Sequence, residues 1–293
     1  MFSLIVCTLG RVQEVDRLLA SLETQTYKEI EVLLVDQNHD DLLDPVLRAH
    51  PNLEIRHLHS APGLSRARNV GLRLARGGII AIPDDDCWYP GHLLMSVSKW
   101  LDDNLDFDVL STIKRSADNA PVGLKWPNSA CQVTPENVWD SAISSTIFMR
   151  RSVTDRVGLF NEGIGVGAPS KYQSGEETDY LLRALEMGFH IWYEPTLTVH
   201  HPPLASIARL RKTTYPFALG MGYVLRVHGY SWRVLTTRFI RSFGGALFSV
   251  CKGDFAQGQI YLSRAAGQLQ GYLFGPRDLR RLAESRRSLE GSA

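Results

Sequence analysis

Three consecutive aspartates, Asp84, Asp85 and Asp86, are the strongest chemical signal in the chain, and they directly follow the apolar run 79–82. That run is typical of a buried strand, and in open α/β sheets ligands bind beyond the carboxyl ends of the strands. Neighbouring carboxylates repel one another unless a cation offsets their charge, and Mg²⁺ and Mn²⁺ prefer oxygen ligands. The motif therefore predicts a divalent metal site. The alternative is a solvated acidic turn that caps the helix expected after Pro90.

Further polar groups are expected near the same crevice. Asp36 ends the apolar run 32–35, so it could accept hydrogen bonds from a nucleobase or a ribose; the alternative is a turn-forming aspartate before Asn38. Arg66 and Arg68 lie in the first turns of the next expected helix, where a guanidinium suits phosphate or base recognition. A solvated helix face is the alternative for the arginines, and the favoured one for Arg66.

Acids and imidazoles recur in the second half of the chain. Glu176, Glu177 and Asp179 begin an expected helix after the glycine-rich loop 158–175. The dipole at a helix N-terminus keeps a carboxylate ionised, as a general base must be. A histidine pair at 200–201 ends a strand-like run, where an imidazole could complete a metal site. The alternatives are an ordinary acidic helix start and a surface histidine pair.

The elements that must position these residues follow from the hydrophobic pattern. β-rich runs alternate with helical patterns, which is typical of a doubly wound, mostly parallel α/β sheet. Strands are expected at 3–8, 31–35, 54–58, 78–82, 108–112 and 190–199, and helices at 14–22, 64–75 and 177–187. The pattern predicts an α/β domain over residues 1–203, followed by a helical region over residues 204–293.

The helical region differs from the rest in charge. Residues 1–201 hold 18 Lys/Arg and 27 Asp/Glu, whereas residues 202–293 hold 14 and 4, and such asymmetry indicates a polyanionic partner, either nucleic acid or an anionic membrane. Arginines alternate there with large apolar residues, and no helix has the roughly 18–20 apolar residues of a membrane span. We therefore expect an amphipathic unit at a membrane surface. A helical cap packed on the α/β domain is the alternative. Helices are expected at 205–211, 217–227, 232–251, 255–274 and 279–289.

The composition is that of a folded globular protein, with 293 residues of which 44% are hydrophobic and 22% charged. The four cysteines lie far apart and form no C-x-x-C pair. This pattern favours neither a zinc ribbon nor a disulfide framework, and it fits a reducing cytosol.

The order and spacing of these motifs resemble the inverting family 2 glycosyltransferases of the GT-A fold, of the kind that build cell-surface polysaccharides, over residues 2–203. One departure is Asp36-Gln37-Asn38, where relatives often have a second acid and a small residue. The matching segments are the opening strand with Cys7-Thr8 and Arg11, the strand end at Asp36, Ala67-Arg68-Asn69-Val70-Gly71, Asp84-Asp85-Asp86 with Pro90, Gly158-Leu-Phe-Asn-Glu162, Gly175-Glu176-Glu177-Thr178-Asp179 with Arg183, and Tyr193-x-Pro195 leading to His201.

This resemblance implies a role for each site residue. Glu177 would deprotonate the acceptor hydroxyl, with Asp179 as the alternative base, and Asp36 would bind the nucleobase with help from Arg68. The metal, Mn²⁺ or Mg²⁺, would be held by Asp84, Asp86 and His201. The residues implied in donor binding are Thr8, Arg11, Asp36, Arg68, Asp84 and Asp85.

The expected activity is inverting, metal-assisted transfer of a sugar from a UDP- or GDP-sugar to a hydroxyl of a lipid-linked or cell-surface glycan. The expected location is the cytoplasm, peripheral on the inner face of the cell membrane, and no nucleic-acid partner is expected. One alternative is a metal-dependent phosphoryl-transfer enzyme, although the first strand ends in Thr8 rather than in an acidic motif. A second alternative is a module that only binds nucleic acid or membrane. A nicotinamide dehydrogenase is disfavoured because no G-x-G-x-x-G follows the first strand.

Overall fold

The computed structural model describes residues 1–203 and 206–276, and the chain divides into two compact units. The sheet unit comprises Met1–Pro62, Arg66–Phe160 and residues 180–203. The helical unit comprises Gly63–Ser65, Asn161–Asp179 and the described residues from 206 onward. The helical unit thus includes loop residues that precede the domain boundary predicted between residues 203 and 204. That boundary stays a prediction. The helix expected at 279–289 lies outside the described residues.

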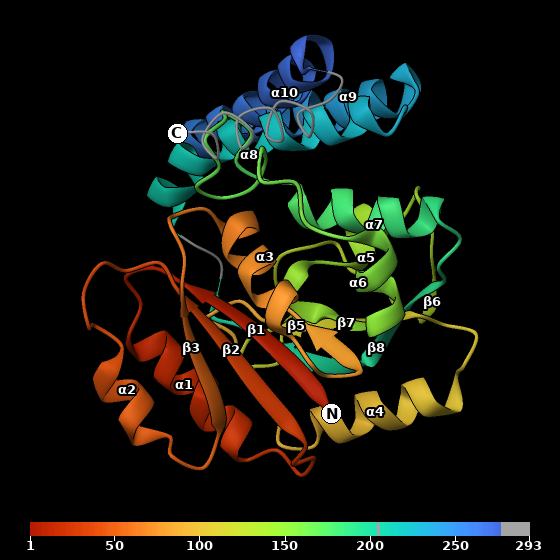
Figure 1. Ribbon diagram of the computed structural model, residues 1–293. Coiled ribbons are helices and arrows are strands. Elements are labelled where there is room, and N and C mark those ends of the chain that lie inside the picture. The colour runs from red at the N-terminus through yellow and green to blue at the C-terminus, as the bar shows by residue number, and fades with distance from the viewer. Residues whose placement is uncertain (204–205, 277–293) are drawn as a thin grey trace, which may run out of the picture. The chain divides into compact units, whose positions relative to one another are not determined.

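Eight strands form one mixed sheet in the described part of the sheet unit, in the order β3-β2-β1-β4-β7-β5-β8-β6 (Figure 1). The pairs β3·β2, β2·β1, β1·β4 and β5·β8 are parallel, whereas β7 runs antiparallel to β4 and β5, and β6 runs antiparallel to β8. The strands span Phe2–Thr8 (β1), Ile30–Asp36 (β2), Glu54–His59 (β3), Ile79–Ala81 (β4), Val109–Arg115 (β5), Cys131–Val133 (β6), Ile147–Arg150 (β7) and Ile191–His200 (β8).

Helices cover both faces of this sheet. An apolar core between β1, β2, α1 and α4 includes Leu4, Leu18, Leu34 and Leu94, so α1 and α4 lie with α2 on one face, and α3 and α6 lie on the other (Figure 1). Gly71 lets α3 approach β1 closely, because a Cβ there would lie 2.3 Å from Ile5 Cγ2. The helices span Gln13–Glu23 (α1), Asp44–Ala49 (α2), Leu64–Leu74 (α3), Leu93–Asp103 (α4), Val138–Ser141 (α5), Arg151–Val157 (α6) and Glu176–Glu186 (α7).

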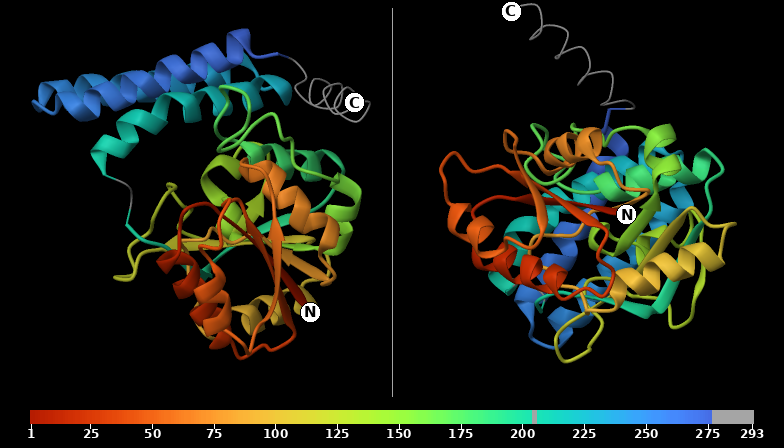
Figure 2. Two further views of the ribbon diagram at one scale, coloured as in Figure 1. Left: turned by 60° about the vertical axis from the view of Figure 1, so that its left-hand side comes forward. Right: turned by 60° about the horizontal axis from the view of Figure 1, so that its bottom comes forward.

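Three longer helices make up most of the helical unit: α8 (Ile207–Val227), α9 (Trp232–Cys251) and α10 (Phe255–Phe274). The helix α10 packs against both α8 and α9 (Figure 2). Its backbone comes close to α8 at Gly271, where a Cβ would lie 2.2 Å from the carbonyl oxygen of Leu219. Within residues 1–203 and 206–276, no helix combines the length and apolar character that crossing a bilayer requires.

The predicted fold class is confirmed: the sheet is mostly parallel, helices flank it, and a helical region follows. The expected strands and helices of the first half are present, with ends shifted by at most three residues. The split between helices 205–211 and 217–227 is wrong, because α8 continues through Pro216. Burial of Thr214, Ala218 and Leu219 around that proline stabilises the helix despite the missing backbone donor.

A buried carboxylate ties the first strands to the segment that follows α3. The side chain of Glu31 is fully buried and accepts hydrogen bonds from the Ser3 hydroxyl and from the Arg76 backbone N–H and Nε, the latter two at 2.6 and 2.9 Å. Burial alone would raise the pKa of Glu31, but these donors outweigh it and hold the pKa below its ordinary value. The ionised form is therefore the one that the fold stabilises.

We predict that Glu31→Gln lowers the free energy of unfolding by about 1–3 kcal/mol at neutral pH, since it weakens hydrogen bonds to a buried charge. A group whose pKa is lowered by folding contributes stability above its unfolded pKa and loses it as the pH falls. The difference between variant and parent should therefore shrink below about pH 4. Urea unfolding of both proteins at several pH values measures this difference in the free energy of unfolding. Glu29→Gln is the control, since Glu29 is 78% exposed; an equal effect of both changes would contradict the prediction.

Candidate metal and donor site

The carboxyl ends of three neighbouring strands bring predicted site residues together. Thr8 ends β1 and lies opposite Asp36, which ends β2. Asp84 follows β4 and forms a parallel bridge with Cys7, so it also lies beside the end of β1. Thr8 and Asp36 are each 1% exposed. The sheet register alone thus places three polar residues along one edge.

Arg11 offsets part of the charge of the aspartate motif. Its Nη1 atom lies 2.5 Å from Asp85 Oδ1 and 2.7 Å from Asp86 Oδ2. Burial, with smaller contributions from the charges of Asp86 and Asp84, raises the pKa of Asp85 to about 6, although Arg11 opposes the rise. Burial acts on Asp86 too, but His201 and Arg11 hold its pKa well below the ordinary value. The motif is a half-buried charge cluster rather than a solvated acidic turn.

His201 reaches the motif from the far end of β8. Two backbone hydrogen bonds join Trp88 and His200, and the next residue, His201, places its Nε2 atom 3.0 Å from Asp86 Oδ1. The Nδ1 atom of the same ring lies 2.7 Å from the carbonyl oxygen of Pro202. A carbonyl oxygen can only accept, so Nδ1 carries the proton, and in a neutral ring the lone pair of Nε2 faces the carboxylate.

Two facing lone pairs repel each other, so a second ring proton or a cation close to both atoms is needed. An imidazole that donates its other N–H to a carbonyl is the usual arrangement of a metal-binding histidine. Asp84, Asp86 and His201 each offer one ligand atom, and the three atoms lie within 4.8 Å of one another. Two carboxylate oxygens and one imidazole nitrogen fit Mn²⁺ or Mg²⁺. These three side chains therefore have ligand atoms of the kind that the predicted metal requires.

Asp84 has two further neighbours in the sheet unit. Ser144 donates a hydrogen bond to Asp84 Oδ1 over 3.1 Å, and Arg68 Nη2 lies 3.8 Å from the same oxygen. Arg68 is only 2% exposed, and its guanidinium lies over the ring of Phe160. Arg68, predicted as a donor-binding residue, thus lies next to the predicted metal ligand Asp84.

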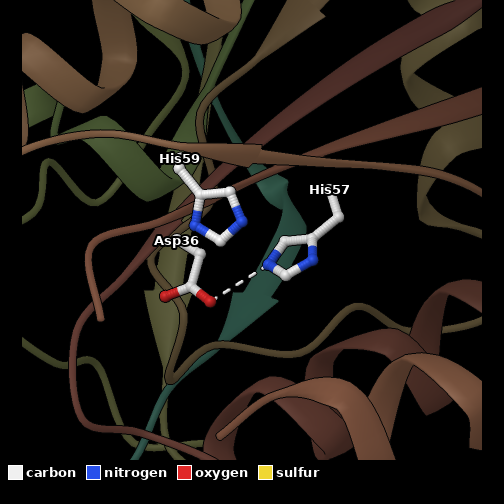
Figure 3. Close-up of side chains that lie close together, drawn as sticks. All are labelled: Asp36, His57 and His59. Carbon is white, nitrogen blue, oxygen red and sulfur yellow. Dashed lines mark hydrogen bonds and ion pairs between the residues drawn. The ribbon is translucent and has the colours of Figure 1, made fainter. Parts of the chain in front are cut away.

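Asp36 is held by neighbours on both of its oxygens. Its Oδ1 accepts hydrogen bonds from the Asn38 backbone N–H and side-chain amide, at 2.8 and 2.7 Å. Its Oδ2 lies 3.0 Å from His57 Nε2, and His59 lies on the same side (Figure 3). The carboxylate is therefore fixed in orientation at the end of β2.

The candidate bases lie in the helical unit, at the start of α7. Asp179 is 1% exposed, and its Oδ1 lies 3.0 Å from Nε2 of the buried His228. Glu176 is also buried, at 4% exposure. Glu177 is partly exposed. Of the three acids, Glu177 is the one whose side chain is most open to an acceptor.

Sequence reasoning did not single out several of these partners. His57 and His59 stand two residues apart in an expected strand, so their shared face could have been recognised from the period-two pattern. Ser144 and His228 gave no local signal, because their partners Asp84 and Asp179 lie 60 and 49 residues away in sequence.

Known proteins resemble this chain in sequence. The profile described as "Glycosyl transferase family 2" matches residues 3–158. The uncharacterized glycosyltransferase YwdF of Bacillus subtilis is 25% identical over 169 residues, which cover 55% of this chain and 62% of that protein. An uncharacterized glycosyltransferase of Haemophilus influenzae is 35% identical over 92 residues, 31% of each chain. The matches thus span less than two thirds of these relatives.

Solved structures resemble this chain in fold. Residues 1–349 of TarS from S. aureus, in complex with UDP-GlcNAc, superpose with a TM-score of 0.59 at 16% identity over 92% of this chain and 90% of that one. The mannosyltransferase PcManGT from Pyrobaculum calidifontis, in complex with GDP-Man and Mn²⁺, gives a TM-score of 0.61 at 16% identity over 92% and 86%. At this identity the likeness concerns the fold, which is the GT-A fold expected from the motifs.

We predict that Asp86→Ala weakens Mn²⁺ binding by roughly tenfold or more, since even outer-shell partners of a metal contribute ~10–100-fold. Calorimetric titration of the full chain with Mn²⁺ measures the change. Asp102→Asn is the control, because Asp102 is an exposed aspartate on α4. Unchanged Mn²⁺ affinity in Asp86→Ala would remove Asp86 from the metal site.

Proposed function

Since the chain belongs to glycosyl transferase family 2, we propose that it transfers a sugar from a UDP- or GDP-sugar to an acceptor hydroxyl with inversion of configuration. The observation that carries this proposal is the cluster of Asp84, Asp86 and His201 at the carboxyl ends of the strands. The two similar structures hold UDP-GlcNAc and GDP-Man with Mn²⁺, which supports a nucleotide-sugar as donor and a divalent cation as cofactor.

The leaving group of such a reaction is a nucleoside diphosphate, whose negative charge must be neutralised as the sugar–phosphate bond breaks. Asp84, Asp86 and His201 would hold Mn²⁺ or Mg²⁺, which supplies positive charge to the diphosphate. Arg11 holds Asp85 and Asp86 in place through its short contacts to both carboxylates. The ligands are therefore oriented before any substrate arrives, which lowers the cost of reorganisation during the reaction.

The donor is proposed to lie along the strand ends. Asp36 would accept a hydrogen bond from the nucleobase, since its carboxylate is fixed by Asn38 and His57. Thr8 lies beside Asp36 in the sheet register, Arg68 lies next to Asp84, and Asp85 stands between Asp84 and Asp86 in the sequence. They would contact the ribose and the diphosphate.

Glu177 is the proposed general base. It must take the proton of the acceptor hydroxyl as that oxygen attacks the anomeric carbon from the face opposite the diphosphate. Its partial exposure lets an acceptor approach, and its place in the first turn of α7 favours the ionised form through the helix dipole. Asp179, the alternative, is buried against His228, which suits a positioning role better.

We predict that Glu177→Gln lowers the rate of transfer by roughly 100-fold or more, the range for loss of general-base catalysis, while donor affinity changes little. A thermal-shift screen of UDP- and GDP-sugars with Mn²⁺ first identifies the donor, and initial rates of product formation are then compared. The isosteric amide keeps the side-chain shape, so a loss reflects the missing base.

The matched variant is Asp179→Asn. If it abolishes transfer in a folded protein while Glu177→Gln retains turnover, the base is Asp179. If no nucleotide-sugar stabilises the parent chain with or without Mn²⁺, the proposed function itself is wrong.

The acceptor is proposed to be a lipid-linked or cell-surface glycan at an anionic membrane, the inner face of the cell membrane in particular. One face of α9 carries an exposed apolar stripe in which Trp232, Ile240, Phe243 and Leu247 are 52–66% exposed. Successive members of this stripe are eight, three and four residues apart, which places them on one side of the helix. Arginines on α9, including the exposed Arg233, would meet anionic headgroups.

We predict that the double variant Phe243→Ser, Leu247→Ser weakens binding to anionic phosphatidylglycerol vesicles by roughly tenfold or more, since each side chain buries apolar area in the bilayer. Flotation at low and high salt measures it, and high salt should weaken binding by the parent chain. Leu105→Ser in the sheet unit is the control, because Leu105 is 77% exposed. Failure of the parent chain to float at low salt would end the membrane proposal.

A further inference from the structure

A second cluster of metal-ligating side chains lies in the sheet unit, at the outer pair of parallel strands. Asp36 ends β2 and lies opposite His59 on β3. His57 stands two residues before His59, so all three side chains project from the same face of the sheet. Figure 3 shows the two imidazoles and the carboxylate next to one another at this edge.

The geometry of the cluster is close to that of a ligand set. His57 Nε2 lies 3.0 Å from Asp36 Oδ2, and the ring centroids of His57 and His59 are 4.6 Å apart. One ligand atom from each of the three residues lies within 4.8 Å of the other two. In a tetrahedral zinc site with bonds of about 2.0–2.1 Å, neighbouring ligand atoms are about 3.3 Å apart. A cation can therefore replace the proton between His57 and Asp36 with little movement.

The surroundings fit such an exchange. His59 is exposed, so its ring has room to rotate toward the other two ligands. The carboxylate of Asp36 is oriented by the two donors of Asn38 on its other oxygen, and such outer-shell contacts raise metal affinity. The cluster thus has one exposed ligand, His59, and two that already lie within hydrogen-bond distance of each other.

The chemistry of the ligands distinguishes this cluster from the first. Two imidazoles and one carboxylate suit Zn²⁺, whereas a set richer in carboxylates suits Mg²⁺ and Mn²⁺. We propose that Asp36, His57 and His59 form a Zn²⁺ site with three protein ligands and a fourth position open to water.

The site has a consequence that rests on the proposed function. Because Asp36 is the residue proposed to bind the nucleobase, Zn²⁺ at this carboxylate and the nucleotide-sugar donor exclude each other. Zn²⁺ then raises the apparent Kd of the donor, and an excess of Mn²⁺ does not relieve the effect.

The test is a Zn²⁺ titration of the untagged, full-length chain, stripped of metal, in competition with a chromophoric chelator and in the presence of excess Mg²⁺. We expect one Zn²⁺ per chain, and a loss of affinity of roughly tenfold or more in His59→Ala and in His57→Ala. Since His59 is exposed, loss in His59→Ala does not reflect unfolding, which circular dichroism verifies. Co²⁺ in place of Zn²⁺ should give the intense visible absorption of a tetrahedral site.

Two control variants locate the binding. His92→Ala removes an exposed histidine before α4 and should leave affinity unchanged. Asp86→Ala removes a ligand of the first cluster and should also leave it unchanged. No Zn²⁺ binding by the parent chain, equal binding by His59→Ala, or loss in Asp86→Ala would each overturn the proposal.

Donor binding, measured with and without Zn²⁺, separates this proposal from the proposed function. Zn²⁺ that binds through His59 and weakens donor binding supports both. Zn²⁺ that binds through His59 without affecting the donor supports the zinc site and overturns only the placement of the nucleobase at Asp36.

Discussion

The electrostatic balance at the end of β4 is the constraint on which the rest of the structure depends. Three adjacent aspartates follow β4 there, and burial favours the neutral form of Asp85 and Asp86 unless charged partners oppose it. Arg11 comes from the loop after β1, and His201 comes from the end of β8. Segments 190 residues apart in the sequence must therefore meet at one point. The neighbouring positions of β1 and β4 bring in Arg11, and the bridge between Trp88 and His200 brings in His201.

The same edge of the sheet carries two clusters whose ligands differ in kind. The cluster of Asp84 and Asp86 with His201 is rich in oxygen, whereas that of His57 and His59 with Asp36 is rich in nitrogen. Since hard cations prefer oxygen and zinc accepts imidazole readily, the two proposed sites would favour different metals. In the proposed function, the first cluster would face the diphosphate of the donor, and Asp36 of the second would face the nucleobase.

Local patterns predicted most of the fold because they depend on the residues of one segment. The buried runs that became β1 and β2, and the helices α9 and α10, follow from the hydrophobic pattern of the sequence. The proline in α8 was misread because packing of its neighbours outweighs the local cost. The antiparallel strand β7 and the contact between Asp179 and His228 depend on long-range pairing, which periodicity does not encode.

The helical unit does more than add a basic surface. The loop before α7 is held against α8, since Ser174 Oγ donates to the carbonyl oxygen of Phe217 over 2.6 Å and the Gln173 backbone N–H donates to Pro216. His228, just after α8, fixes the buried Asp179. The start of α7, where Glu177 lies, is therefore braced by α8 and by the residue that follows it. If α9 rests on a membrane, as proposed, the proposed base and the surface that meets a lipid-linked acceptor belong to one packing unit, because α10 packs against both α8 and α9.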